Sequence, residues 1–190
     1  MNNSQIKSYR IISSEVPFKH EQREKISKTF FAISDYLKKY PNPGACHLIS
    51  SVMYVLLNEQ GIESDLCIGE VKEENYFFDH SWIEIDGEIF DIAIQFTLNG
   101  DKNPPIFAGY SLQTEERTSR IYGLASLNGL DIQAKGVLKT PFTKYMDGFP
   151  IHKEGAWTII KKIGKELRLK LDTKDLRNKY KKTQRKLVCK

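Results

Sequence analysis

The chain has 190 residues, enough for one well-packed domain, and its 40% hydrophobic and 11% aromatic residues are typical of a globular core rather than a disordered chain. No apolar run approaches the roughly 18 residues of a membrane span, and the N-terminus lacks the apolar segment of a secretory signal. We therefore expect a soluble, cytoplasmic protein without a transmembrane segment.

The net charge of +5 is unevenly distributed along the chain. Residues 153–190 hold 14 Lys or Arg and 4 Asp or Glu, a net of +10, whereas the rest of the chain holds 15 and 20, a net of −5. An asymmetry of this kind indicates an acidic partner for the basic end.

The three cysteines, Cys46, Cys67 and Cys189, are far apart, and their odd number argues against a disulfide framework. No C-x-x-C or H-x-x-x-H pair is present, which excludes the zinc-finger and zinc-protease motifs. We therefore expect free thiols, no metal site and no cofactor.

Residues 20–40 have the periodicity of an amphipathic helix, which must end near Tyr40 because two prolines follow. A second, mostly buried helix is predicted to begin at Cys46, behind a Pro-Gly turn, and to end at Gly61 as a C-cap glycine. The apolar positions of the two helices are Ile26, Phe30, Ile33 and Leu37, and then Leu48, Ile49, Val52, Met53 and Leu56.

The periodicity then changes to that of strands, which we predict over residues 64–71, 76–85 and 88–94. Asp86-Gly87 joins the last two, and this dipeptide between apolar runs is a strong signal for a hairpin with a type I′ turn. A helix that leads into an antiparallel sheet predicts an α+β fold.

Residues 95–151 are interrupted by glycines and prolines, so we assign no elements there and expect substrate-contacting loops. Helical spacing returns at Trp157, and Asp172 is the predicted N-cap of a final helix. That final helix would carry Leu176, Tyr180 and Leu187. We accordingly divide the chain into a domain of residues 1–171 and a basic, helical C-terminal tail of residues 172–190.

The hairpin allows a geometric test for a site. With two residues in the turn, Trp82 lies opposite Asp91, and His80, Trp82 and Asp91 point to one face because side chains alternate along a strand. Asp91 is then the diagonal neighbour of His80, about 7–8 Å away between backbones. Glu84 shares the face but lies about 13 Å along the strand. The carboxylate partner of His80 in this hairpin should therefore be Asp91.

Cys46 is placed where a thiol is easily ionised. A helix N-terminus presents unpaired N–H groups and the positive end of the helix dipole, and a nearby imidazole lowers a thiol pKa further. A thiolate is a nucleophile, an imidazole moves the proton, and a carboxylate orients the imidazole. The first turn of the helix also supplies N–H groups for a developing oxyanion.

These residues together resemble the core of the transglutaminase-like superfamily. The resemblance rests on two stretches, GACHLISSVMYVLLNEQGIESDLCIG and HSWIEIDGEIFD, within residues 44–94. It implies a papain-like fold with a Cys-His-Asp triad formed by Cys46, His80 and Asp91, and activities that include peptidase, amidase, deamidase and acyl transfer. The positions that follow the family pattern are Gly44, Cys46, Gly61, Ile62, Gly69, His80, Trp82, Glu84, Gly87 and Asp91.

The sequence departs from the family pattern in two respects. The interval from His80 to Asp91 is short, which the tight Asp-Gly turn explains. No Trp or Gln stands out as the second oxyanion donor, and Tyr40 and Asn42 are candidates only by proximity.

Other interpretations of the same residues remain open. Cys46 can be a small buried side chain, which is the commoner role of a free cysteine. A metal site of Cys46, His47, His80 and Asp91 is disfavoured because adjacent ligands on one helix diverge, and His47 is better suited to a surface or substrate-facing role. The lysines of the basic tail can be solvated faces of helices, or can contact nucleic acid, a membrane surface or an acidic protein.

The sequence therefore predicts a cysteine-dependent hydrolase or acyltransferase that acts on an amide or peptide bond through a thioester. Cys46 would be the nucleophile, His80 the general base and acid, and Asp91 the orienting carboxylate, with a peptide or protein as substrate. The alternative is a non-catalytic binding module of the same family, which would use its basic C-terminal helices to contact an acidic partner.

Overall fold

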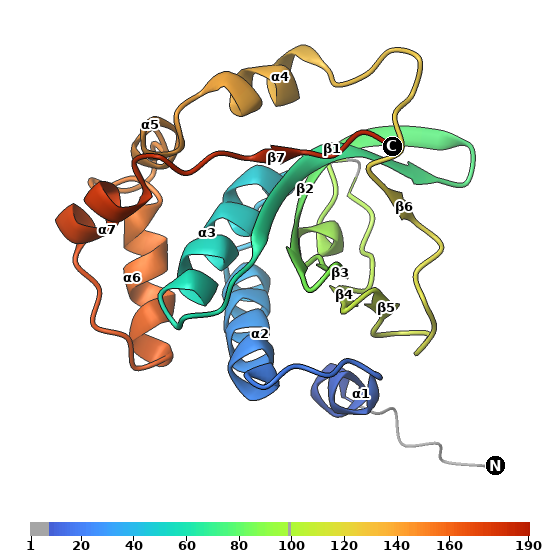
Figure 1. Cartoon of the computed structure of the whole chain (residues 1–190), viewed down its shortest axis with the longest axis horizontal. Coiled ribbons are helices and arrows are strands. Elements are labelled where there is room, and N and C mark those ends of the chain that lie inside the picture. Colours follow the sequence, from blue (N-terminus) through green and yellow to red (C-terminus); the bar gives the residue numbers. More distant parts are fainter. Residues whose placement is uncertain (1–7, 99) are drawn as a thin grey trace.

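Helix α3, Cys46–Asn58, lies at the centre of the molecule, between a curled sheet on one side and helices α2, Arg23–Lys39, and α6, Trp157–Glu166, on the other (Figure 1). The computed structural model describes residues 8–98 and 100–190; residues 1–7 of the predicted domain and residue 99 lie outside this range. The mixture of helices and a mostly antiparallel sheet confirms the α+β class.

The two N-terminal helices pack beneath the sheet. Helix α2 keeps the predicted apolar face, and a short helix α1, Tyr9–Glu15, precedes it. Arg23 at the start of α2 joins the two, because its guanidinium donates to the carbonyl oxygens of Ser13 at 2.6 Å and Val16 at 2.8 Å. These bonds satisfy carbonyl groups that the end of α1 leaves unpaired.

Helix α3 begins at Cys46 as predicted, and nearly all of its side chains are buried. The last helical residue is Asn58, and Gly61 terminates the helix as the predicted C-cap glycine. Gly61 has φ of +75° and follows a further turn that is closed by a bond from Ile62 N to Leu57 O, 3.1 Å. The glycine is needed because a left-handed residue lets the chain reverse into the first strand.

The main sheet has the order β3-β2-β1-β6, with β7 also paired to β1. Strands β1, Asp65–Glu73, and β2, Tyr76–Ile85, form a long hairpin, and β3 is Glu88–Phe90. Ile85 pairs with Glu88, which is the register that a two-residue turn predicts. Asp86 and Gly87 have φ of 52° and 77°, so both turn residues have the positive φ that a type I′ turn needs.

The third strand is shorter than the predicted range of 88–94. After Phe90 the chain leaves β2, Asp91 forms a bridge with Ile106, and Ala93–Gln95 form a 3₁₀ helix, η1. The reason lies in Asp91, whose Oδ1 accepts the backbone N–H of Ile94 at 3.1 Å and so favours a turn over an extended chain.

The unassigned range 95–151 contains several short elements. These are β4, Ile106–Phe107; β5, Tyr110–Ser111; β6, Ile121–Tyr122; α4, Ile132–Lys139; and α5, Phe142–Asp147. Strands β4 and β5 form a separate two-stranded sheet, and β6 pairs with β1 at Val71 and Lys72. The loop after β6 returns to β1, where Ser126 donates its backbone N–H and hydroxyl to the carboxylate of Glu70.

At the C-terminal end, Asp172 caps helix α7, Thr173–Tyr180, as predicted, by accepting the N–H groups of Lys174 and Asp175. The prediction that this helix extends to Leu187 was wrong. Lys186–Leu187 form strand β7, which runs parallel to β1 and pairs with Cys67 and Ile68. The free edge of β1 offers hydrogen bonds to an extended chain, and this tertiary pairing replaces the helix.

The described part of the C-terminal segment packs against the body. Leu176 and Tyr180 are buried in the main core. The division of the chain at residue 171 stays a prediction. No helix of the described residues has the length and apolar character that crossing a membrane requires.

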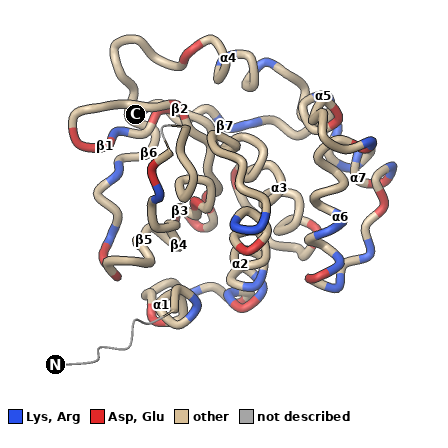
Figure 2. Tube along the Cα trace, turned by 180° about the vertical axis from the view of Figure 1, so that it is seen from behind, with Lys and Arg blue, Asp and Glu red and all other residues tan. Residues whose placement is uncertain are grey.

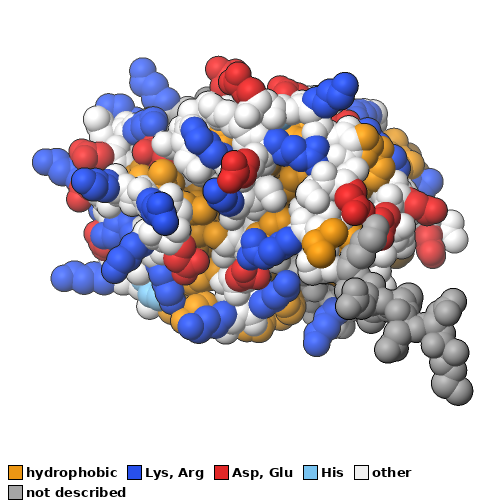
Figure 3. Space-filling model, turned by 90° about the horizontal axis from the view of Figure 1, so that it is seen from below, with side chains coloured by type: hydrophobic (Ala, Val, Ile, Leu, Met, Phe, Trp, Pro, Cys, Tyr) orange, Lys and Arg blue, Asp and Glu red, His pale blue; other side chains and the backbone are white. Residues whose placement is uncertain are grey.

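The charge asymmetry of the sequence has an intramolecular counterpart. Both Lys or Arg and Asp or Glu positions are marked along α6 and α7 in Figure 2, and many basic side chains gather at that end of the molecule in Figure 3. Three of these cations contact carboxylates from before residue 153, namely Arg177 with Asp147, Lys179 with Glu59 and Lys186 with Asp65. Part of the basic charge therefore faces the acidic body of the same chain.

Candidate active site

Cys46 lies at the first position of α3, where the backbone before it turns sharply. Gly44 has φ of +74°, a left-handed conformation that favours glycine, so the turn needs glycine for its backbone conformation. The N-cap is Ala45, and among the described residues no side chain caps this helix. The first N–H groups of α3 therefore remain available to a ligand.

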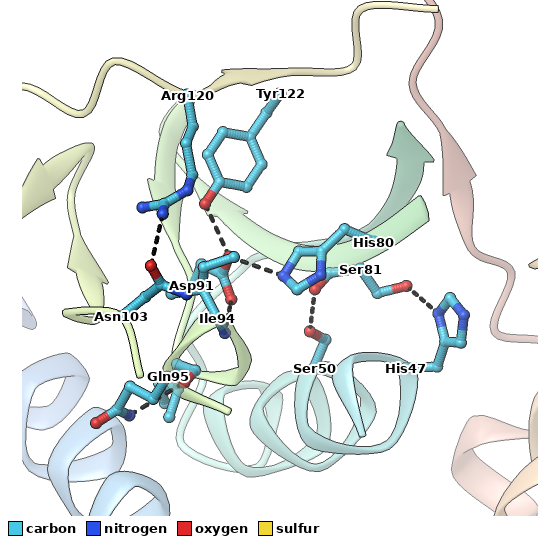
Figure 4. A network of polar contacts seen from close by, with 11 residues as sticks. His47, Ser50, His80, Ser81, Asp91, Ile94, Gln95, Asn103, Arg120 and Tyr122 are labelled. Atoms are coloured by element: carbon cyan, nitrogen blue, oxygen red, sulfur yellow. Dashed lines mark hydrogen bonds and ion pairs between the residues drawn. The ribbon is translucent and has the colours of Figure 1, made fainter. Parts of the chain in front are cut away.

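His80 and Asp91 are in direct contact, as the hairpin register predicts. His80 Nε2 and Asp91 Oδ2 are 2.8 Å apart, and both residues are buried, with exposed fractions of 5% and 1% (Figure 4). The contact fixes the orientation of the ring. Because it uses Nε2, the other ring nitrogen, Nδ1, is not engaged by Asp91. The predicted pairing of these two residues is confirmed, whereas their chemical roles stay a proposal.

Asp91 accepts hydrogen bonds from three donors. Besides His80, these are the hydroxyl of Tyr122 at 2.7 Å, on the same oxygen, and the backbone N–H of Ile94 at 3.1 Å. Figure 4 shows the Tyr122 hydroxyl pointing at the Asp91 carboxylate beside the His80 ring. These three donors hold the buried carboxylate in one orientation beside the His80 ring.

The thiol of Cys46 and the ring of His80 interact as opposite charges. Burial alone would raise the pKa of Cys46, but the positive charge of His80 and hydrogen bonds from His47 and His80 outweigh it and lower this pKa to about 5. Burial alone would lower the pKa of His80, yet the charges of Asp91 and of the Cys46 thiolate raise it to about 10. The neutral-pH state is therefore a thiolate beside an imidazolium.

His47 is closer to the thiol than the helical spacing suggested. Its Nδ1 is 2.7 Å from the hydroxyl of Ser81, and its ring lines the same pocket as Cys46. Ser50 and Ser51 hold the turn behind it, since their hydroxyls donate to the carbonyls of Ser81 at 2.8 Å and of His47 at 2.6 Å. A substrate-facing position, one of the two roles considered for His47, agrees with this placement.

A pocket of about 280 Å³ opens beside the thiol. Gly44, Cys46, His47 and His80 line it, together with the apolar side chains of Phe78, Phe96 and Leu98. Tyr40 and Asn42 do not line it, and Tyr40 instead accepts a hydrogen bond from Lys162. Neither is therefore supported as an oxyanion donor.

The remaining sequence candidates occupy structural positions. Trp82 is fully buried against Tyr122, with ring centroids 5.1 Å apart, and its indole N–H donates to Glu84 at 2.9 Å. Cys67 is buried in β1, and burial with the neighbouring Glu84 raises its pKa; Cys189 is exposed. Among the described residues, no group of three or more His, Cys, Asp and Glu is arranged to hold a metal ion.

Comparison with known families now adds to this geometry. Residues 8–97 match the family model described as the transglutaminase-like superfamily. The similarity covers slightly less than half of the chain, and we call residues 8–97 the transglutaminase-like region. The transglutaminase-like region includes α1 and α2 and extends the range of residues 44–94 on which the sequence resemblance rests. No curated protein and no solved structure matches the chain.

Two groups of pocket or network residues lie beyond the transglutaminase-like region. Tyr122 comes from β6, and Asp131 and Gln133 come from the start of α4. Sequence reasoning missed them because β6 has only two residues and α4 has no strong apolar stripe. The one sequence signal was Asp131, which precedes a helix as a typical N-cap and accepts the N–H of Ala134 at 2.7 Å.

Proposed function

We propose that the protein is a cysteine-dependent hydrolase or acyltransferase that acts on an amide or peptide bond. The observation that carries this proposal is the buried chain of interactions from the Cys46 thiol through His80 to Asp91, at the edge of a pocket. In this assignment Cys46 is the nucleophile, His80 the general acid and base, and Asp91 the orienting carboxylate. We place them in a catalytic domain of residues 1–171 with a papain-like core.

The first step follows from the charges of the resting pair. The Cys46 thiolate attacks the carbonyl carbon of the bound amide, and the negative charge moves to the carbonyl oxygen. The N–H groups at the start of α3, which no side chain caps, belong to residues that line the pocket and would stabilise that oxyanion. The His80 imidazolium then donates its proton to the amide nitrogen, the carbon–nitrogen bond breaks, and a thioester on Cys46 remains.

The second step uses the same groups in reverse. Neutral His80 takes a proton from an incoming water or amine, which attacks the thioester carbonyl. Cys46 leaves as a thiolate and the acid or new amide is released. Asp91 keeps His80 in one orientation through both steps, because its oxygen bonds Nε2 and leaves the other ring nitrogen for the thiol and the substrate.

A peptide mixture derived from a proteome tests the proposal directly. The wild type and the Cys46→Ser variant are incubated with it, with and without hydroxylamine, and new termini and hydroxamates are identified by mass spectrometry. We expect products that require Cys46, as acids in water and as hydroxamates with hydroxylamine. Identical peptide profiles for the two proteins would contradict the proposal.

The alternative of a non-catalytic module that binds an acidic partner through the C-terminal helices is less well supported. Several cations of this segment already contact carboxylates of the same chain, and Arg185 is 8% exposed. A buried guanidinium offers no surface charge to a partner. The segment is better explained as part of the packed protein.

A further inference from the structure

The pocket beside Cys46 has an unusual charge for a basic protein. Its lining includes four carboxylates, those of Glu73, Asp79, Asp101 and Asp131, and among the described lining residues there is no Lys or Arg. The chain as a whole carries a net charge of +5. The pocket is therefore a local acidic region on a basic molecule, and it lies where a substrate must enter.

Glu73 has partners that account for its charge. It forms an ion pair with Arg120 and accepts the hydroxyl of Tyr76 at 2.6 Å. Glu70, which lies nearby on the same strand, is held by the two donors of Ser126. These two carboxylates have structural roles within the fold.

Asp79 and Asp131 differ, because they lie against each other. The backbone N–H of Asp131 donates to Asp79 Oδ2 at 2.8 Å, and Asp131 Oδ1 accepts the N–H of Ala134. Each of these two hydrogen bonds uses one oxygen of its carboxylate. Within residues 8–98 and 100–190, neither carboxylate has a Lys or Arg partner. Burial and the neighbouring charge of Asp131 raise the pKa of Asp79, as expected for two like charges held together.

The pair borders the reacting group. Both residues line the pocket that Cys46, His47 and His80 line, and the charge of His47 lowers the pKa of Asp131 further, after its bond from Ala134. The apolar wall of Phe78, Phe96 and Leu98 lies in the same pocket. A ligand that complements this lining has an aliphatic or aromatic part and a positive charge, as a lysine or arginine side chain does.

We propose that Asp79 and Asp131 are specificity-determining residues that select a substrate with a positively charged side chain next to the bond that Cys46 attacks. The inference rests on the proposed function and adds a substrate class to it. A bound cation relieves the repulsion between the two carboxylates, so their interaction with such a substrate is more favourable than that of an isolated surface carboxylate.

Charged thiol reagents of similar size test the selection without any knowledge of the substrate. The trimethylammonioethyl and sulfonatoethyl methanethiosulfonates both convert a thiolate to a mixed disulfide with loss of methanesulfinate, and peptide mass spectrometry separates labelling of Cys46 from that of Cys189. Each rate is divided by the rate of the same reagent with 2-mercaptoethanol, because the charge of the thiolate itself makes the cationic reagent intrinsically faster. We expect the normalised rate at Cys46 to be about tenfold higher for the cationic reagent than for the anionic one at low salt. Asp79→Asn with Asp131→Asn should remove most of this preference.

The controls lie in the same molecule. Asn keeps one side-chain oxygen, which can still accept the backbone N–H at each position, and it is a good N-cap residue. The double variant is therefore expected to fold. Exposed Glu63 lies outside the pocket, and Glu63→Gln should leave the preference at Cys46 unchanged. Cys189 lies beside Lys190 in the basic segment and should keep its own ratio of the two rates in every variant.

A matched pair of peptidyl chloromethyl ketones, ending in lysine or in norleucine, extends the test to substrate-like ligands. We expect faster inactivation by the lysyl compound, with its advantage lost in the double variant. Equal normalised rates for the two thiol reagents at wild-type Cys46, or a normalised preference that survives in the double variant, would overturn the inference. Slow labelling by both reagents below pH 7 would instead contradict the thiolate of the proposed function, and the ratio would still test the selection.

Discussion

The charge of His80 is expected to control the ionisation of Cys46, and the His80→Ala variant tests this dependence. In the wild type, burial opposes the thiolate, and the interactions with His80 and His47 overcome it. Removal of the imidazole leaves burial and one weaker partner. We therefore expect the pKa of Cys46 to rise from about 5 to the range of an ordinary thiol, about 8.5, or above.

The size of the effect on alkylation follows from two opposing factors. At pH 6 a thiol with a pKa of about 5 is mostly ionised, whereas one with a pKa of about 8.5 is ionised to roughly 0.3%. The more basic thiolate is intrinsically more nucleophilic, by roughly 40-fold for a Brønsted coefficient of about 0.45. The net expectation at pH 6 is a fall of about tenfold in rate, which reverses above about pH 7.

Iodoacetamide labelling from pH 4 to 10, read by peptide mass spectrometry, measures the profile. Cys67 is fully buried and should stay unlabelled in every folded variant, so it reports whether His80→Ala has unfolded the protein. His152→Ala, a histidine outside the pocket, should leave the profile unchanged. A wild-type profile that rises only above about pH 8, or an identical profile in His80→Ala, would refute the reasoning.

Three further outcomes are expected. Tyr122→Phe removes a hydrogen bond to the buried Asp91 carboxylate and should lower the unfolding free energy by about 1.5–3 kcal/mol in urea titrations; no change would mean that the bond adds nothing. Deletion of residues 184–190 removes β7 from the edge of β1 and should lower the thermal midpoint, and an unchanged midpoint would show that β7 is dispensable. Folding favours the Cys46 thiolate and the His80 imidazolium, so both charges contribute to the stability of the folded protein. The contribution of Cys46 should be lost as pH falls through about 5, and that of His80 as pH rises through about 10. Urea titrations across this pH range measure the free energy of unfolding of the wild type and of Cys46→Ala. If both proteins lost the same stability on the acid side, the ion pair of Cys46 and His80 would be contradicted.

Local patterns were enough to place Cys46, His80 and Asp91 within the fold. The Pro-Gly turn and the apolar spacing after it predicted that α3 begins at Cys46, because helix boundaries depend on nearby residues. The Asp86-Gly87 turn predicted the hairpin register, and with it the contact of His80 with Asp91. Both inferences need only short-range geometry, since a two-residue turn sets every pair that follows it.

The surroundings of these groups depended on contacts between distant parts of the chain. Tyr122 reaches Asp91 because a two-residue strand pairs with β1, and a strand that short has no periodicity to detect. The carboxylates of Asp79 and Asp131 meet because a loop from β6 to α4 returns to the sheet. Strand β7 replaced a predicted helix because the free edge of β1 was available to it. The sequence by itself determined the start of α3 at Cys46 and the contact of His80 with Asp91, and only the tertiary structure decided what surrounds them, because pairing between segments far apart in the chain leaves no local pattern.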